Sequence, residues 1–220
     1  MAGNSGTTTG EAMYYWGEEI ANAVTHGVGL LLSCAGLAVL AVYSVLYGSV
    51  WHVVACSIYG STLILLYLSS TLYHAIASPP VKHFFRILDH SSIYLLIAGS
   101  YTPFLLVCLR NTLGITLLSI LWGLSAAGIL FKIFCVGGYE HFSTLLYVAM
   151  GWIVVFAVRP MAHALTWRGM AWILAGGLFY TGGVLFYASR RRYFHAIWHI
   201  CVLLGSVCHY FAILFFVVLR

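Results

Sequence analysis

The sequence predicts an all-α membrane protein, a single bundle of seven transmembrane helices, and three observations support this fold class. Of the 220 residues, 62% are hydrophobic and only 7% are charged, whereas soluble domains carry about 25% charged residues. Mean hydropathy is +0.98, so the surface has to be solvated by lipid. At about 20 residues per membrane crossing, the chain has room for about seven helices and no large soluble domain.

The apolar stretches are separated by proline, glycine and charged residues, which commonly punctuate helices. Ser78-Pro79-Pro80 should stop the second helix and Arg159-Pro160 the fifth, and Pro103 lies inside the third. Residues 1–17 are expected to form a disordered tail and residues 18–220 the transmembrane domain. The expected spans are about Ile20–Tyr47, Trp51–Ala77, Phe84–Leu109, Leu113–Phe134, Phe142–Val158, Met170–Ser189 and Phe194–Leu219.

Basic residues in the loops predict the orientation. Seven spans place six basic residues on the side of the amino terminus and four on the other side, and cytoplasmic loops carry the excess of Lys and Arg. We therefore expect a cytoplasmic amino terminus and an external carboxy terminus. The first group is Lys82, Arg86, Lys132, Arg190, Arg191 and Arg192, and the second is Arg110, Arg159, Arg168 and Arg220.

The remaining composition excludes some classes of protein. No basic run is long enough for a nucleic-acid surface, so we expect membrane lipids and no nucleic acid as partners. The six cysteines lie in apolar segments without a CxxC motif, which predicts buried free thiols rather than a disulfide framework. They are Cys34, Cys56, Cys108, Cys135, Cys201 and Cys208.

Ionisable residues inside the spans are costly in hydrocarbon and therefore indicate function. His195 and His199 lie four residues apart at the start of the last span, so their side chains share one face of the helix. His74 lies near the end of the second span, four residues after Ser70, and Asp89 lies near the start of the third. All of these helix ends should lie at the cytoplasmic face, so the topology predicts one cluster of three histidines and a carboxylate.

Such a cluster suits a divalent metal ion. Three neutral imidazoles and one open position are typical of a catalytic zinc site. Asp89 could hold or deprotonate a bound water, and Ser70 could orient the site. We predict His74, His195 and His199 as zinc ligands and Asp89 and Ser70 as catalytic residues.

Four segments resemble the hemolysin III family, which belongs with the progestin and adipoQ receptors and more distantly with the alkaline ceramidases. They are GEEIANAVTHGVG (17–29), SSTLYHAI (69–76), LDHSSIYLLIAGSYTPF (88–104) and FHAIWHICVLLGSVCHY (194–210). The resemblance implies seven helices and a cytoplasmic amino terminus. It also implies zinc bound by the three histidines, with Asp89 contacting the metal through water and Ser70 in the same SxxxH pattern.

Each of these residues also has a plainer interpretation. The histidines could be interfacial residues at helix ends, and Asp89 could be a solvated residue that the helix dipole favours. A stripe of Glu18, Asn22, His26, Gly29 and Ser33 along the first span could support the metal or serve small-residue helix packing. His209 lies roughly 21 Å along its helix from His195, too far to share that metal.

Three functions stay open at this stage. The first is a zinc-dependent hydrolase that cleaves a lipid amide or ester, with the substrate in the helix cavity. The second is a non-catalytic sensor or receptor of membrane state with structural zinc. The third is a cytolysin, which the family name suggests but the apolar sequence, without a polar lumen stripe, does not support. We favour membrane lipid homeostasis in a multi-pass protein of the cell membrane, by expectation the bacterial inner membrane. A retinal protein is set aside because neither lysine lies within the last span.

Overall fold

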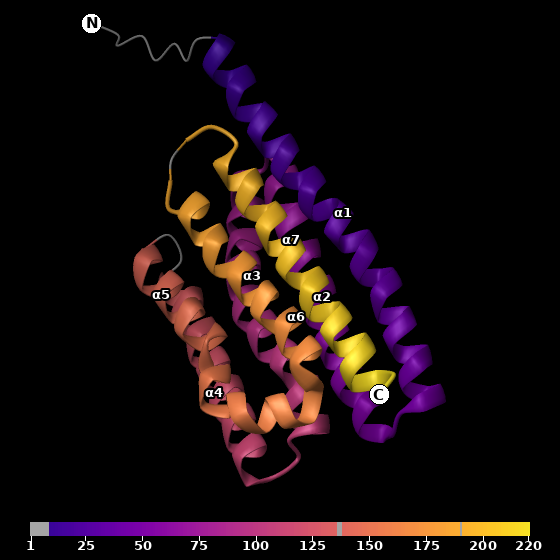
Figure 1. Cartoon of the computed structure of the whole chain (residues 1–220). Coiled ribbons are helices and arrows are strands. Elements are labelled where there is room, and N and C mark those ends of the chain that lie inside the picture. Colours follow the sequence, from indigo (N-terminus) through magenta and orange to yellow (C-terminus); the bar gives the residue numbers. More distant parts are fainter. Residues whose placement is uncertain (1–8, 136–137, 190) are drawn as a thin grey trace, which may run out of the picture.

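The structure is a computed structural model that describes residues 9–135, 138–189 and 191–220, with side chains from Trp16 onward. Within these residues every long element is an α-helix, and the helices form one bundle (Figure 1). The α-helices are α1 (Thr9–Tyr47), α2 (Val50–Ala75), α3 (Pro79–Pro103), α4 (Thr112–Cys135), α5 (Glu140–Gly151), α6 (Val158–Tyr187) and α7 (Phe194–Ile213). Short helical turns extend three of them: η1 (Phe104–Cys108), η2 (Ile153–Ala157) and η3 (Leu214–Val218).

Most predicted spans lie close to the observed helices, and the differences have physical causes. Helix α1 begins at Thr9, earlier than the expected start at about Ile20. Residues 1–8 of the predicted tail lie outside the described part of the chain. Pro79 begins α3 rather than only stopping α2. A proline fits the first turn of a helix because its missing N–H would have no partner there.

The predicted fifth and sixth spans form one segment, Glu140–Tyr187, of 48 residues. The structure therefore has six helices long and apolar enough to cross a membrane among its described residues, and the predicted count of seven is not confirmed. This segment is not one straight helix. The turn η2 interrupts it, and Thr166 has a left-handed φ of 62° inside α6.

Figure 1 shows what these breaks do to the path of the chain. From α5 the chain crosses the lower end of the bundle along the first part of α6, and the rest of α6 then runs back beside α5. Helix α1 begins at the upper end, whereas the chain ends after α7 at the lower end. Arg159 and Pro160, predicted to stop the fifth span, lie instead in the first turn of α6.

The exterior and interior of the bundle are both apolar. Leu185 and Phe156 are each 75% exposed, as expected for side chains that face lipid. The interior holds large aromatic side chains, including fully buried Tyr59 and Tyr94. Hydrophobicity therefore does not separate the outside from the inside, and the buried polar side chains are the informative ones.

The cysteines are free, as predicted, but they are not uniformly buried. Cys56 and Cys208 are buried, Cys108, Cys135 and Cys201 are partly buried, and Cys34 is exposed. Cys34 lies on α1, which forms an outer helix of the bundle (Figure 1). The prediction of a buried thiol is therefore wrong for Cys34, because an apolar span can turn any of its faces toward lipid.

Candidate metal centre

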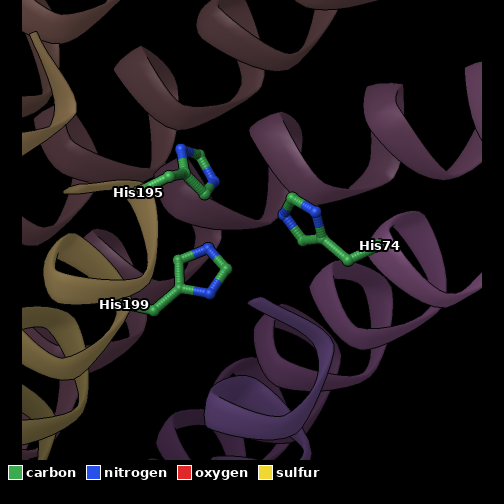
Figure 2. A group of neighbouring side chains, drawn as sticks. All are labelled: His74, His195 and His199. Atoms are coloured by element: carbon green, nitrogen blue, oxygen red, sulfur yellow. The ribbon is translucent and has the colours of Figure 1, made fainter. Parts of the chain in front are cut away.

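Three histidines from two helices meet at the end of the bundle where α1 begins. His74 lies in the last turn of α2, and His195 and His199 lie in the first two turns of α7. Each histidine offers one ring nitrogen such that these atoms all lie within 4.8 Å of one another. Figure 2 shows the three rings directed toward a common space between the helices. The predicted triad is thus brought together.

The ring nitrogens of the triad fit a metal ion. The Nε2 atoms of His74, His195 and His199 are all buried and have no hydrogen-bond partner among the residues that the structure describes. Leaving a buried polar atom unpaired costs about 1–3 kcal/mol, so three such atoms in one place require an explanation. A bound cation would satisfy all three lone pairs, and imidazole suits zinc as well as copper, iron and nickel.

The other nitrogens of two histidines are held by helix α1. The Nδ1 atom of His74 lies 3.2 Å from Oε2 of Glu19. The Nδ1 atom of His199 lies 3.2 Å from the carbonyl oxygen of Asn22 and 3.2 Å from Oγ1 of Thr25. A carboxylate and a carbonyl only accept hydrogen bonds, so these contacts place the proton of a neutral imidazole on Nδ1. Nε2 then keeps the lone pair that a metal requires.

The stripe on α1 divides into the two roles that the sequence left open. His26 stacks on His199 with ring centroids 3.5 Å apart, and the backbone carbonyl of Asn22 accepts from the same histidine, so this end of the stripe supports the triad. Gly29 has another role, because an added Cβ would lie 2.6 Å from the Tyr67 ring. Ser33 donates to the carbonyl of Gly29 within the helix. The far end of the stripe therefore serves close helix packing.

Asp89 and Ser70 are buried beside each other but outside the triad. Ser70 is 1% exposed and Asp89 4%, and neither belongs to the group of atoms that the three histidines form. The Asp89 carboxylate is not among the atoms that approach one another within 4.8 Å. Asp89 instead lines a cavity inside the bundle, which is described next. Asp89 is thus not part of the group of three histidines, and its contact with a metal through water stays a prediction.

A cavity of about 630 Å³ lies between α3, α5, α6 and α7. Its lining is mostly apolar and includes Asp89 and His26, and it reaches Phe104, 15 residues along α3 and η1 from Asp89. At about 1.5 Å per residue this distance is about 22 Å. The three triad histidines do not line the cavity. Two neighbours of His199 do line it: His26, which stacks on the His199 ring, and Trp198, whose ring centroid lies 5.2 Å from that of His199.

A second polar cluster lies next to Asp89 and was not predicted. Lys132 lies in the last turn of α4, near the end of the span expected there, but it is fully buried and donates to Glu140 at 2.8 Å. Arg86 and His90 also approach Glu140, at 3.6 and 3.9 Å, and His90 lies 3.8 Å from Asp89. The chain has only five acidic residues, and this scarcity was the signal that could have singled out Glu140 and Glu19.

The fold and the triad describe a polytopic membrane protein with a candidate metal centre at one end of its helix bundle. Comparisons with known proteins agree with this class. A family profile described as haemolysin-III related matches residues 14–210. Over 91% of its length the chain is 50% identical to Hemolysin-3 of Bacillus cereus and 48% identical to the Hemolysin-3 homolog of Bacillus subtilis (strain 168), covering 92% and 95% of those proteins.

The chain belongs to the hemolysin III family. Similarity extends further, to the human Monocyte to macrophage differentiation factor, with 29% identity over 89% of this chain and 83% of that protein. The resemblance drawn from the four sequence segments is therefore confirmed.

Proposed function

We propose that this protein is a zinc-dependent lipid hydrolase that acts in membrane lipid homeostasis, cleaving an amide or ester at the cytoplasmic leaflet. One observation carries the proposal: three buried Nε2 atoms without partners belong to a triad whose neighbours His26 and Trp198 line an apolar cavity that has a carboxylate, Asp89, in its wall. A zinc ion held by His74, His195 and His199 would supply Lewis acidity and an activated water.

The cavity has the chemistry of a lipid site. Its lining extends about 22 Å along α3 and η1, more than the roughly 15 Å that one leaflet contributes to a hydrocarbon core of about 30 Å. An acyl chain in this cavity would have its polar end beside Asp89 and His26. Asp89 would accept the proton of the attacking water as a general base, while the apolar walls exclude other water from the carbonyl.

We further propose that the chain crosses the membrane seven times, with a cytoplasmic amino terminus. The breaks at η2 and Thr166 and the return path in Figure 1 support two crossings by Glu140–Tyr187. The positions of α1 and of the carboxy terminus at opposite ends of the bundle support an odd number of crossings. This topology places the triad on the cytoplasmic side.

Asp89→Asn tests the reaction. The substitution should keep about one zinc per chain but abolish hydrolysis, because an amide of the same shape cannot accept the proton. Zinc content and fatty-acid release from ceramide or phospholipid are measured in proteoliposomes. His74→Ala serves as the matched control and should lose both zinc and activity. Loss of zinc in Asp89→Asn would make Asp89 a direct ligand and the site a closed, structural one.

A second candidate function is a membrane-state sensor in which the metal only ties α2 to α7. The observation that favours it is that none of the three triad histidines is among the residues that line the cavity. Wild-type protein that binds zinc but releases fatty acid from no lipid would favour the sensor. The name Hemolysin-3 carried by the Bacillus cereus relative points to a third function, cytolysis, and dye leakage from vesicles tests it.

A further inference from the structure

Glu19 lies where α1 meets α2 and α3 next to the triad. Its Oε2 atom is 3.2 Å from Nδ1 of His74 and 2.8 Å from Nζ of Lys82. The side chain of Glu19 is only 15% exposed and that of His74 4%. A single carboxylate oxygen thus joins one histidine of the triad to a lysine on another helix.

The contact to His74 has a chemical consequence. Because the carboxylate can only accept, the neutral imidazole must carry its proton on Nδ1. The lone pair is then on Nε2, the buried and unpaired atom that belongs to the triad. A carboxylate on the far side of an imidazole also fixes the orientation of the ring and increases its basicity as a ligand.

Lys82 and its surroundings hold Glu19 in this position. Lys82 Nζ also donates to the carbonyl oxygen of Tyr73 at 3.0 Å and lies 4.9 Å from the centre of the Tyr73 ring. Tyr73 directly precedes His74 on α2, so the lysine is fixed against the same helix turn that carries the histidine. The carboxylate is therefore restrained from both sides.

The carboxylate contact distinguishes His74 from His199. His199 Nδ1 faces a backbone carbonyl and a hydroxyl, which are neutral groups. Of the hydrogen-bond partners described for His74 and His199, only Glu19 carries a charge. A direct effect of charge on these two ligands therefore comes from Glu19 on α1. Its neighbour Glu18 points elsewhere, because its Oε1 atom accepts the backbone N–H of Tyr193 at 2.5 Å.

We propose that Glu19 is a positioning residue of the metal centre, which sets the metal affinity through His74. The inference rests on the proposed metal site and is independent of whether the protein is a hydrolase. It assigns to α1, which carries none of the predicted ligands, control over the strength of the site.

Metal affinity of the purified full-length protein in detergent tests this role. Glu19→Ala should weaken zinc binding 10- to 100-fold, the usual effect of losing such a partner, in competition with a chromophoric chelator. Glu19→Gln should give a smaller loss, because its amide oxygen can still accept from His74 but carries no charge. The visible absorption bands of bound Co²⁺ should shift in both variants, since they report the geometry around the ion.

Glu18→Gln is the matched control, since it removes the same charge one residue away and keeps an oxygen for the Tyr193 N–H. It should retain the wild-type zinc affinity and Co²⁺ spectrum. Wild-type affinity and an unchanged spectrum in both Glu19 variants would overturn the inference and leave Glu19 as an ion-pair partner of Lys82 alone. If Glu19→Ala does not fold, Glu19→Gln decides. Absence of metal binding in the wild type is a distinct result, which overturns the proposed site and this role together.

Discussion

His199 uses its two ring nitrogens for different tasks. Nδ1 meets Asn22 and Thr25 on α1, and Nε2 faces the triad without a partner. The ring is completely buried and stacks on His26. A ring held by a stacked partner and at one nitrogen is prepared for a ligand at the other nitrogen, because its orientation costs little further entropy when the metal binds.

His199→Ala should therefore remove the metal and lower the thermal stability of the protein in detergent. His74 and His199 are 125 residues apart in the sequence, so the metal joins distant helices and contributes a mass-action stabilisation of about 3–4 kcal/mol near saturation. Metal content and the unfolding temperature with and without a chelator give the answer. His209→Ala, ten residues further along α7 and outside the triad, should keep its metal. Retention of stoichiometric zinc by His199→Ala would show that His199 is not a ligand.

The triad could be predicted from the sequence because the prediction required only that the three histidines lie at the same depth in the membrane. His195 and His199 share a helix face by their spacing, and His74 reaches the same end of the bundle because consecutive helices are antiparallel. The contact between Glu19 and His74 could not be predicted in this way, because it depends on how α1 is rotated about its axis relative to α2. The spacing of Asn22, His26, Gly29 and Ser33 alternates between four and three residues, which is the pattern of one helix face. At about 100° per residue, Glu18 and Glu19 lie equally far from the centre of that face, so the spacing does not distinguish them.

At the scale of elements, glycines determine how closely the helices approach. Gly128 on α4 faces Tyr94 on α3, and a Cβ there would lie 2.4 Å from the tyrosine ring. Tyr94 is fully buried and has Tyr147 beside it at a centroid distance of 4.4 Å. The ring therefore has little room to move, and α4 lies against α3 only because residue 128 has no side chain.

Gly128→Ala should destabilise the bundle by about 1–3 kcal/mol through overpacking. Gly123 on the same helix is the control, since in the described part of the chain nothing beyond its own helix turn lies within 4 Å of an added Cβ. Gly123→Ala should cause no loss of stability, because alanine favours the helix over glycine. Thermal unfolding of both variants in the same detergent compares them directly, and equal stability would mean that Tyr94 moves aside without cost.

The ends of the fifth and sixth helices are the part of the fold that the sequence predicted least well. Proline and charge marked Arg159-Pro160 as an end, yet both residues fit the first turn of α6. The interruption lies at η2 and at Thr166, a residue that carries no sequence signal for a positive φ. A threonine is rarely left-handed, so local sequence preference does not account for this break.

At the scale of the whole molecule, the two ends of the bundle differ in charge, because the few acidic residues gather at one end. Four of the five acidic residues, Glu18, Glu19, Asp89 and Glu140, lie near the ends of helices where α1 begins, and the fifth, Glu11, lies close by on α1. Lys82, Arg86 and Lys132 pair with Glu19 or Glu140 at this same end, and Arg190, which the charge count included, lies outside the described residues. Pairing of opposite charges lowers their cost near hydrocarbon and concentrates the chemistry of the protein at one membrane face.

Reporter insertions test that polarity and the number of crossings together. A reporter at Arg191, between α6 and α7, should be cytoplasmic, and a reporter fused after Arg220 should be external, because the bundle ends there on the opposite side from the start of α1 (Figure 1). A reporter near Thr166 should also be external, since α5 and the second part of α6 would then each cross the membrane. Paired alkaline phosphatase and fluorescent-protein fusions give opposite signals at each position. A cytoplasmic signal near Thr166 would show that Glu140–Tyr187 does not cross twice, and an external signal at Arg191 would place the triad on the wrong side for the proposed reaction.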